Sequence, residues 1–161
     1  MPLPKKAQVW GFDLMIGSII FVVGILVFYL YSLNSPDETL GTFSTLSHDG
    51  NLIAETLLSE GFPENWDEDN VTDPGILSNN KINQTKLERF YDLSTNNYQK
   101  SRNLFNTPFD YYVYVSGNLT IAGEQVPGIG NPPTNPKNLI KITRITIYNN
   151  KLVDLNVEIW E

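Results

Sequence analysis

The chain has no cysteine and a single histidine among its 161 residues. The absence of cysteine excludes a disulfide framework, a thiolate metal site and a cysteine nucleophile. The one histidine, His48, is followed by Asp49 on a predicted helix, where adjacent side chains point apart, so a Ser-His-Asp site would need a serine from elsewhere. The motifs of zinc proteases, P-loops and dinucleotide-binding loops are absent too. We therefore expect no catalytic residues and a chain that is not an enzyme.

Basic residues are also scarce, with 11 Lys and Arg against 18 Asp and Glu and a net charge of −7. From residue 37 onward there are 17 acidic and 9 basic residues, so this part of the chain carries a charge of −8. A surface of that sign repels nucleic acid and anionic lipid headgroups, and it favours solubility. We therefore expect no nucleic-acid partner.

One segment lacks charge altogether. Residues 14–33 (LMIGSIIFVVGILVFYLYSL) form an apolar run, and as a helix rising about 1.5 Å per residue it matches the roughly 30 Å hydrocarbon core of a bilayer. The run is longer than the apolar region of a secretory signal, and no A-x-A-like site follows it. Lys5 and Lys6 precede the run, and the next basic residue is Lys81. This bias predicts a single-pass protein of the cell membrane with a cytoplasmic N-terminus and an outside C-terminal domain.

An amphipathic helix is predicted directly after the apolar run. Residues 35–38 (SPDE) match the S-x-x-E capping box with proline at the first helical position. Over residues 36–61 apolar positions recur three or four apart, which is typical of a helix with one buried stripe, and Gly61 would end it. Gly41 and Gly50 disfavour helix, so the segment is either one helix or two shorter ones. The stripe consists of Leu40, Phe43, Leu46, Gly50, Ile53 and Leu57.

A polar turn region and two helices are predicted for the middle of the chain. The turn region is residues 62–75 (FPENWDEDNVTDPG), which are rich in turn-forming residues. Asn83 is the expected N-cap of a helix whose buried stripe contains Leu87, Phe90 and Tyr91. The segment TNNYQKSRNLF that follows can form a second short helix.

Strand-like periodicity begins at residue 109. The segment FDYYVYVSG at 109–117 is aromatic and β-branched, which favours a strand, and NLTIA at 118–122 could pair with it. Residues 123–138 are rich in Gly, Pro and Asn and are predicted to form a long loop. Tyr112 and Tyr114 would share the outer face of the strand, either as a contact surface or packed beneath a loop.

Residues 139–161 predict a hairpin, because two alternating runs flank Asn149-Asn150 and asparagine tolerates positive φ. The isoleucines of the first run change phase, and a bulge near Thr143-Arg144 would reconcile them. The second run alternates between a core face and a wet face, as in an antiparallel sheet packed on one side. The residues expected on its wet face are Asp154, Asn156, Glu158 and Trp160.

These elements predict an α+β fold, in which a long N-terminal membrane helix continues into an amphipathic helix packed on a small C-terminal antiparallel β-sheet. Their order resembles that of type IV pilins. The sequence KKAQ at residues 5–8 also resembles the archaeal class III signal peptide, in which basic residues and a Gly or Ala precede the cut. The basic residues of this leader are Lys5 and Lys6. The resemblance implies cleavage by a prepilin peptidase between Ala7 and Gln8.

The resemblance also implies three regions and a function. They are a cytoplasmic leader (1–7), a transmembrane and filament-core helix (8–34) and an extracytoplasmic α+β domain (35–161). The implied function is that of a structural subunit of an archaeal type IV pilus-like filament or pseudopilus at the cell surface. Its partners would be the membrane, a prepilin peptidase, and other pilin-like subunits or copies of itself. The alternative is a single-pass, signal-anchored extracytoplasmic domain that binds a ligand or partner.

Candidate assembly residues lie in the apolar helix. Many pilins carry a glutamate at the fifth mature position, thought to pair with a neighbour's N-terminal amine, whereas here the acid is Asp13, one position later. Asp13 either lies at the cytoplasmic membrane interface or neutralises a polar partner inside a helix bundle. The small residues Gly17, Ser18 and Gly24 would let other helices approach closely.

The acidic segment ENWDEDNVTD contains oxygen ligands of the kind that Ca²⁺ prefers, with Asp67, Asp69 and Asp73 as the candidate ligands. Its spacing does not match an EF-hand, and a solvated acidic loop is the alternative. No other cofactor is expected.

Three N-x-T sequons lie beyond the apolar run, on the predicted outside. Asn70, Asn83 and Asn118 are therefore candidate glycosylation sites, and the protein would then be a glycoprotein. Modification of Asn83 would compete with its predicted role as a helix cap.

Overall fold

The structure is a computed structural model that describes residues 6–34 and 38–161, with side chains at 11–33 and 41–161. The chain divides into two compact units, residues 1–38 and 39–161, which are described separately. The second is called the C-terminal unit below. It combines helices with antiparallel sheets, as an α+β fold requires.

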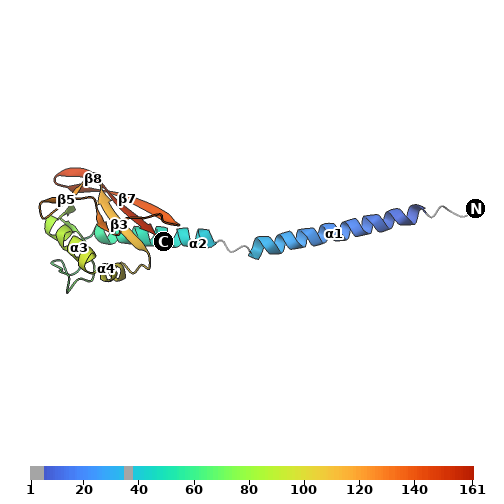
Figure 1. The fold of residues 1–161 in the computed structure, drawn as a ribbon, viewed down its shortest axis with the longest axis horizontal. Helices are drawn as coiled ribbons and strands as arrows, with labels where there is room; N and C mark the ends of the chain where they lie inside the picture. The colour runs from blue at the N-terminus through green and yellow to red at the C-terminus, as the bar shows by residue number, and fades with distance from the viewer. Residues whose placement is uncertain (1–5, 35–37) are drawn as a thin grey trace, which may run out of the picture. The chain divides into compact units, whose positions relative to one another are not determined.

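Helix α1 (Lys6–Asn34) is a single helix of 29 residues that contains the whole predicted apolar run (Figure 1). Every residue from Gly11 to Leu33 is exposed. The predicted capping box falls on residues 35–38, of which 35–37 lie outside the described residues.

Helix α2 (Glu38–Leu57) is continuous. It is not divided at either of the two glycines, Gly41 and Gly50, where the sequence allowed a break. Gly50 is buried, and a Cβ there would lie 3.0 Å from Ile142 Cγ1 and 3.1 Å from Ile159 Cγ2. The glycine therefore lets α2 approach the sheet closely. The predicted stripe is buried from Leu46 onward, since Leu46 is fully buried whereas Phe43 is 38% exposed.

The main sheet has four antiparallel strands in the order β6-β3-β8-β7. Its strands are β3 (Asp110–Val115), β6 (Ile129–Gly130), β7 (Leu139–Tyr148) and β8 (Lys151–Trp160). The predicted hairpin is confirmed, since Asn149 and Asn150 have φ of 50° and 60° at the turn between β7 and β8.

The predicted bulge at Thr143-Arg144 is wrong. Thr143 pairs with Asn156 and Arg144 with Leu155, in a register that runs unbroken from one end of the hairpin to the other. The phase change has a simpler cause. Ile145 belongs to the outer face of the sheet and is 71% exposed, because neighbouring residues in a strand point to opposite faces.

Two short hairpins accompany the sheet. One joins β1 (Leu77–Ser78) to β2 (Lys81–Ile82), and the other joins β4 (Leu119–Ile121) to β5 (Glu124–Val126). The prediction that NLTIA pairs with the preceding strand is therefore wrong. Ala122 and Gly123 have φ of 49° and 86° and turn β4 back onto β5. The predicted loop over 123–138 consequently contains β5 and β6.

Both predicted middle helices are present, as α3 (Gln84–Asn96) and α4 (Tyr98–Leu104). The cap prediction is confirmed, because Asn83 Oδ1 accepts a hydrogen bond of 3.1 Å from the backbone N–H of Lys86. Leu87 and Phe90 are buried, whereas Tyr91 is half-buried.

The core lies between the helices and one face of the sheet. Phe90 of α3 stacks on Tyr111 of β3 with ring centroids 6.3 Å apart, and Tyr111 pairs with Ile159, the residue that also faces Gly50 of α2. Both helices therefore cover the same face. Figure 1 shows the sheet on one side of the unit and the helices on the other.

Tertiary packing buries three residues that the sequence pattern had placed in a polar turn region or on a solvent-facing strand face. Trp66, in the predicted polar turn region, is fully buried and donates its indole N–H to Gly75 O at 2.8 Å. Asn156 and Trp160, predicted on the wet face of β8, are only 5% and 6% exposed. The side chain of Asn156 is satisfied there, because Thr143 Oγ1 donates to Asn156 Oδ1 at 2.9 Å.

Candidate functional site

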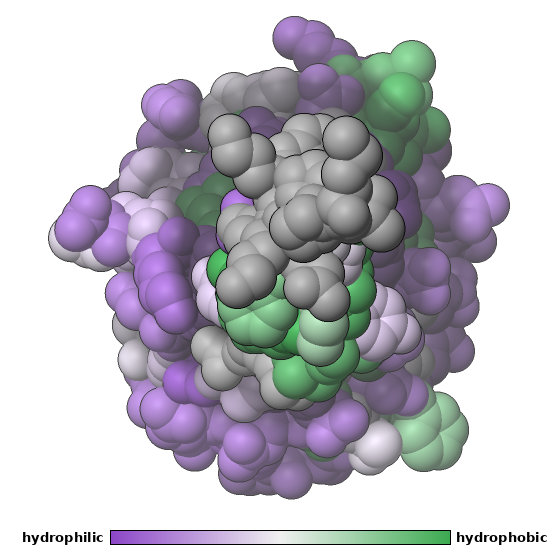
Figure 2. Space-filling view, turned by 90° about the vertical axis from the view of Figure 1, so that its right-hand side faces the viewer, coloured by the Kyte–Doolittle hydropathy of each residue, from purple (hydrophilic) through white to green (hydrophobic). Residues whose placement is uncertain are grey.

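Helix α1 is apolar on every side. Its segment Gly11–Leu33 is long and apolar enough to cross a membrane. In Figure 2 the described part of this helix is green, whereas hydrophilic purple dominates the visible surface of the C-terminal unit. A helix without a polar face is stable only where apolar material surrounds it.

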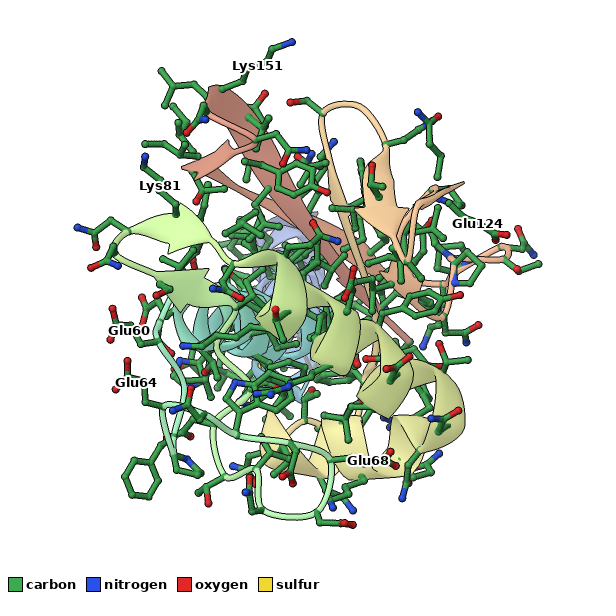
Figure 3. All side chains as sticks on the ribbon, turned by 90° about the vertical axis from the view of Figure 1, so that its left-hand side faces the viewer. Glu60, Glu64, Glu68, Lys81, Glu124 and Lys151 are labelled. Carbon is green, nitrogen blue, oxygen red and sulfur yellow. The ribbon has the colours of Figure 1, made fainter. Side chains whose placement is uncertain are left out.

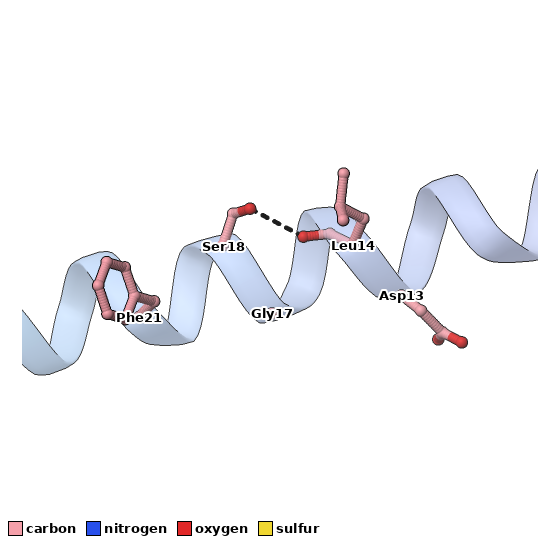
Figure 4. A pocket seen from close by; sticks show the side chains of 5 residues that line it. All are labelled: Asp13, Leu14, Gly17, Ser18 and Phe21. Atoms are coloured by element: carbon pink, nitrogen blue, oxygen red, sulfur yellow. Dashed lines mark hydrogen bonds between the residues drawn. The ribbon is translucent and has the colours of Figure 1, made fainter.

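A hollow on α1 brings together three of the four predicted assembly residues. It is lined by Asp13, Leu14, Gly17, Ser18 and Phe21. Figure 4 shows Asp13 on one side of the helix and Ser18 on the other, with Gly17 one turn from Asp13. A Cβ at Gly17, or at Gly24 farther along, would meet nothing within 4 Å. Both glycines therefore leave the helix surface open to a neighbour.

The two polar side chains in this hollow differ in their hydrogen bonding. The Ser18 hydroxyl donates to Leu14 O, one turn back, at 2.9 Å. This common arrangement lets a serine sit in an apolar helix without an outside partner. Asp13 has no hydrogen-bond or ion-pair partner among the described residues. If α1 enters an apolar surrounding, Asp13 is the group that needs one.

The predicted processing residues are only partly described. Lys5 lies outside the described residues, whereas Lys6, Ala7 and Gln8 have helical backbone within α1. Their side chains lie outside the described part of the chain.

The acidic loop uses one of its candidate calcium ligands for local structure. Asp67 Oδ1 accepts the backbone N–H groups of Asp69 at 3.0 Å and Asn70 at 3.1 Å. Figure 3 shows Glu60 and Glu64 pointing outward from the segment between α2 and β1. Among the described residues, no group of three or more Asp, Glu, His or Cys side chains is close enough to hold a metal ion. This includes the candidate ligands Asp67, Asp69 and Asp73.

The three sequons differ in exposure. Asn70 and Asn118 are exposed, and Asn118 Nδ2 donates to Gln125 Oε1 at 2.8 Å. Asn83 is half-buried at the start of α3. Its cap uses the side-chain oxygen, so a sugar on the side-chain nitrogen would leave the capping acceptor in place.

The single histidine and its neighbour have separate surroundings. His48 is exposed on α2, whereas Asp49 is 8% exposed and accepts a hydrogen bond of 2.9 Å from Thr107 Oγ1. Asp49 therefore ties α2 to the segment that leads into β3.

On the outer sheet face Tyr112 and Tyr114 lie side by side, with ring centroids 5.7 Å apart. The Tyr114 hydroxyl donates to Glu158 Oε1 at 2.8 Å, and the Lys141 ammonium lies 5.1 Å from the Tyr114 ring centroid. These contacts extend across β3, β8 and β7.

Sequence reasoning missed a cavity of about 370 Å³ between α3 and β6. The sequence carries only a partial signal for it. Ser94 and Thr95 lie three and four positions after Tyr91, which places all three on one face of the predicted helix, but this spacing does not indicate which segment lies opposite. The lining residues are Tyr91, Ser94, Thr95, Tyr98, Gly128, Gly130 and Asn131.

A buried hydroxyl network supports one wall of this cavity. The Tyr111 hydroxyl lies 2.8 Å from Ser94 Oγ and 2.6 Å from Ser101 Oγ, while Tyr98 OH accepts the Tyr111 backbone N–H at 3.0 Å. Burial raises the pKa of Tyr111 to about 12. Burial, with a smaller contribution from Asp110, also raises the pKa of Tyr98 above its ordinary value.

Comparison with protein-family models, with curated proteins and with solved structures found no match.

Proposed function

We propose that the chain is a structural subunit of an archaeal type IV pilus-like filament or pseudopilus, anchored by its N-terminal helix. The supporting observation is the exposure of every described side chain of α1, which leaves an apolar rod to be covered by lipid or by other helices. The order of elements agrees with this proposal, since an apolar helix precedes a helix that packs on an antiparallel sheet.

Assembly would use the hollow on α1. Gly17 and Gly24 are seven residues apart, nearly on one face, so they admit the backbone of a neighbouring helix. Asp13 would supply the negative charge for an amine of a neighbouring subunit, and the new N-terminal amine at Gln8 is the nearest such group in the proposed mature chain. Pairing would remove the cost of an isolated carboxylate in an apolar bundle.

The proposed orientation places the C-terminal unit outside the cell. Lys5 and Lys6 would remain on the cytoplasmic side. The charge of −8 from residue 37 onward keeps the outer part solvated and discourages contact with anionic lipid headgroups. Asn70 and Asn118 are the exposed sequons that glycosylation enzymes outside the membrane would reach.

The test is the intact mass and N-terminal peptide of the protein purified from its native membrane. We expect a chain that begins at Gln8, with or without cyclisation of that glutamine. Ala7→Gly should preserve the cut and Ala7→Phe should abolish it, because the archaeal signal has a small residue at this position. A wild-type chain beginning at Met1 or Pro2 would contradict the proposal.

A second candidate function is that of a signal-anchored ectodomain that binds a ligand. The observation that favours it is the cavity beside Tyr91 and Tyr98. An uncleaved chain that still binds a ligand through this cavity would select the second candidate over the first.

A further inference from the structure

One wall of the cavity is formed by the end of α3 and the start of α4. Tyr91, Ser94 and Thr95 share one face of α3, and Tyr98 begins α4 after one non-helical residue. Ser94 is 5% exposed and held by the Tyr111 hydroxyl at 2.8 Å. This wall is therefore fixed to the core.

The Tyr98 ring is equally fixed. Its hydroxyl lies 3.1 Å from Asp110 Oδ1 and accepts the backbone N–H of Tyr111. Its ring centroid lies 5.3 Å from that of Tyr111. The Arg102 guanidinium carbon also lies over this ring, 6.0 Å from its centroid, so the ring offers a fixed apolar edge beside the polar groups of the cavity.

The opposite wall is backbone that packs closely against β3. A Cβ at Gly128 would overlap Tyr112 Cζ, and one at Gly130 would lie 2.5 Å from Tyr111 O. Gly130 also has φ of 102°, which favours glycine. The backbone N–H of Asn131 donates to Tyr111 O at 3.0 Å. Both walls are thus preorganised, which lowers the entropy cost of binding.

The chemistry of the lining is neutral and rich in hydrogen-bonding groups. None of the described residues that line the cavity is charged. Three of its polar side chains have no hydrogen-bond partner among the described residues: the Tyr91 hydroxyl, the Thr95 hydroxyl and the Asn131 amide. Hydroxyls both donate and accept, and an amide offers two donors and one acceptor. The complementary ligand is neutral and carries several hydroxyls on an otherwise apolar ring.

We propose that this cavity binds one ring of a neutral saccharide. The Tyr91 ring and the edge of Tyr98 would contact its carbon face, while the Tyr91 hydroxyl, the Thr95 hydroxyl and the Asn131 amide would hydrogen-bond its hydroxyls. This activity is separate from filament assembly, because all its residues belong to the C-terminal unit. A chain anchored at the cell surface could thereby attach to polysaccharide.

The test is an NMR titration of the isotope-labelled full chain in lipid nanodiscs. Nanodiscs are needed because maltoside detergents carry saccharide headgroups that would compete. The probes are glucose, galactose, mannose and N-acetylglucosamine, with glucuronate as a charged counterpart. We expect saturable shifts of backbone signals in residues 91–98 and 128–131 for at least one neutral sugar, and weaker shifts for glucuronate because the chain is negatively charged.

Two variants test the contacts. Tyr91→Phe keeps the ring and should weaken the binding of that sugar roughly five- to tenfold through loss of one hydrogen bond. Tyr91→Ala should abolish measurable binding. The matched control is Tyr114→Phe, another half-buried tyrosine that neither lines the cavity nor touches Gly128, and it should bind as the wild type does.

Two outcomes would overturn the inference. One is that no neutral sugar shifts these signals, and the other is that the shifts persist unchanged in a folded Tyr91→Ala variant. Neither outcome bears on the N-terminal cut at Gln8, so failure of saccharide binding and failure of the filament proposal are distinguishable.

Discussion

The two units of this chain use the same apolar residue types in opposite surroundings. Ile20 in α1 is 67% exposed, whereas Ile53 in α2 is fully buried. In α1 apolar residues occupy every side of the helix, while in α2 they alternate with polar ones. The C-terminal unit therefore covers its own apolar surface, and α1 depends on lipid or on other chains.

Their carboxylates differ in the same way. Asp49, on α2, is buried and accepts a hydrogen bond from Thr107. Asp13, on α1, has no partner among the described residues. The folded unit satisfies its polar groups internally, whereas α1 leaves an acid for something outside this chain to satisfy.

The largest expected effect comes from separating the units. A chain of residues 39–161 should remain in solution and unfold cooperatively, since its core is complete within that range. The full chain should sediment with membranes and resist carbonate extraction, because each large apolar side chain of α1 gains about 1.5–3 kcal/mol on leaving water. A truncated chain that aggregates, or a full chain released by carbonate, would remove the contrast between the units.

A matched pair of isoleucine substitutions would sharpen the contrast. Ile53→Ala should lower the free energy of unfolding of the C-terminal unit by about 2–5 kcal/mol, because it leaves a cavity in the core. Ile20→Ala should leave that free energy unchanged. Urea unfolding of the full chain in nanodiscs, followed by the fluorescence of the buried Trp66, measures both. Equal effects of the two substitutions would show that the units do not unfold independently.

A smaller effect concerns high pH. Folding raises the pKa of Tyr111 to about 12 from an ordinary value of about 10, so the unfolded chain loses this proton first. The stability linked to Tyr111 is complete below about pH 10 and falls by on the order of 2 kcal/mol as the pH approaches about 12. Tyr98 adds to the fall in the same direction.

Urea unfolding at about pH 9 and about pH 11 measures this dependence. Tyr111→Phe should flatten it, whereas Tyr29→Phe in α1 should not alter it. A pH dependence that stays the same in Tyr111→Phe would contradict the assignment to the buried phenol.

Local signals predicted much of this fold. Asn83 caps α3, Asn149-Asn150 turn the hairpin, and the charge-free run forms one helix, because each depends on chemistry within a few neighbouring residues. The pairing of β4 with β5 was missed. It depends on positive φ at Ala122, and alanine carries no sequence signal for that conformation.

The candidate sites divide in the same manner. Asp13, Gly17, Ser18 and Gly24 are candidates that the sequence alone could suggest, because an acid beside an apolar run and small residues within it are visible in one segment. The cavity was missed because Tyr91 and Asn131 meet only when β6 pairs with β3 beside α3. No spacing within either segment indicates that encounter.

Amino-acid order alone was sufficient for the apolar character of α1, because a charge-free run of this length stays apolar in any fold. Strand alternation likewise established which residues share a face of β8. Packing decided which of those faces and turns are buried. Trp66 and Trp160 are buried, whereas Ile145 is exposed. Burial depends on segments that are distant in the chain, and the residue pattern within one strand carries no information about those segments.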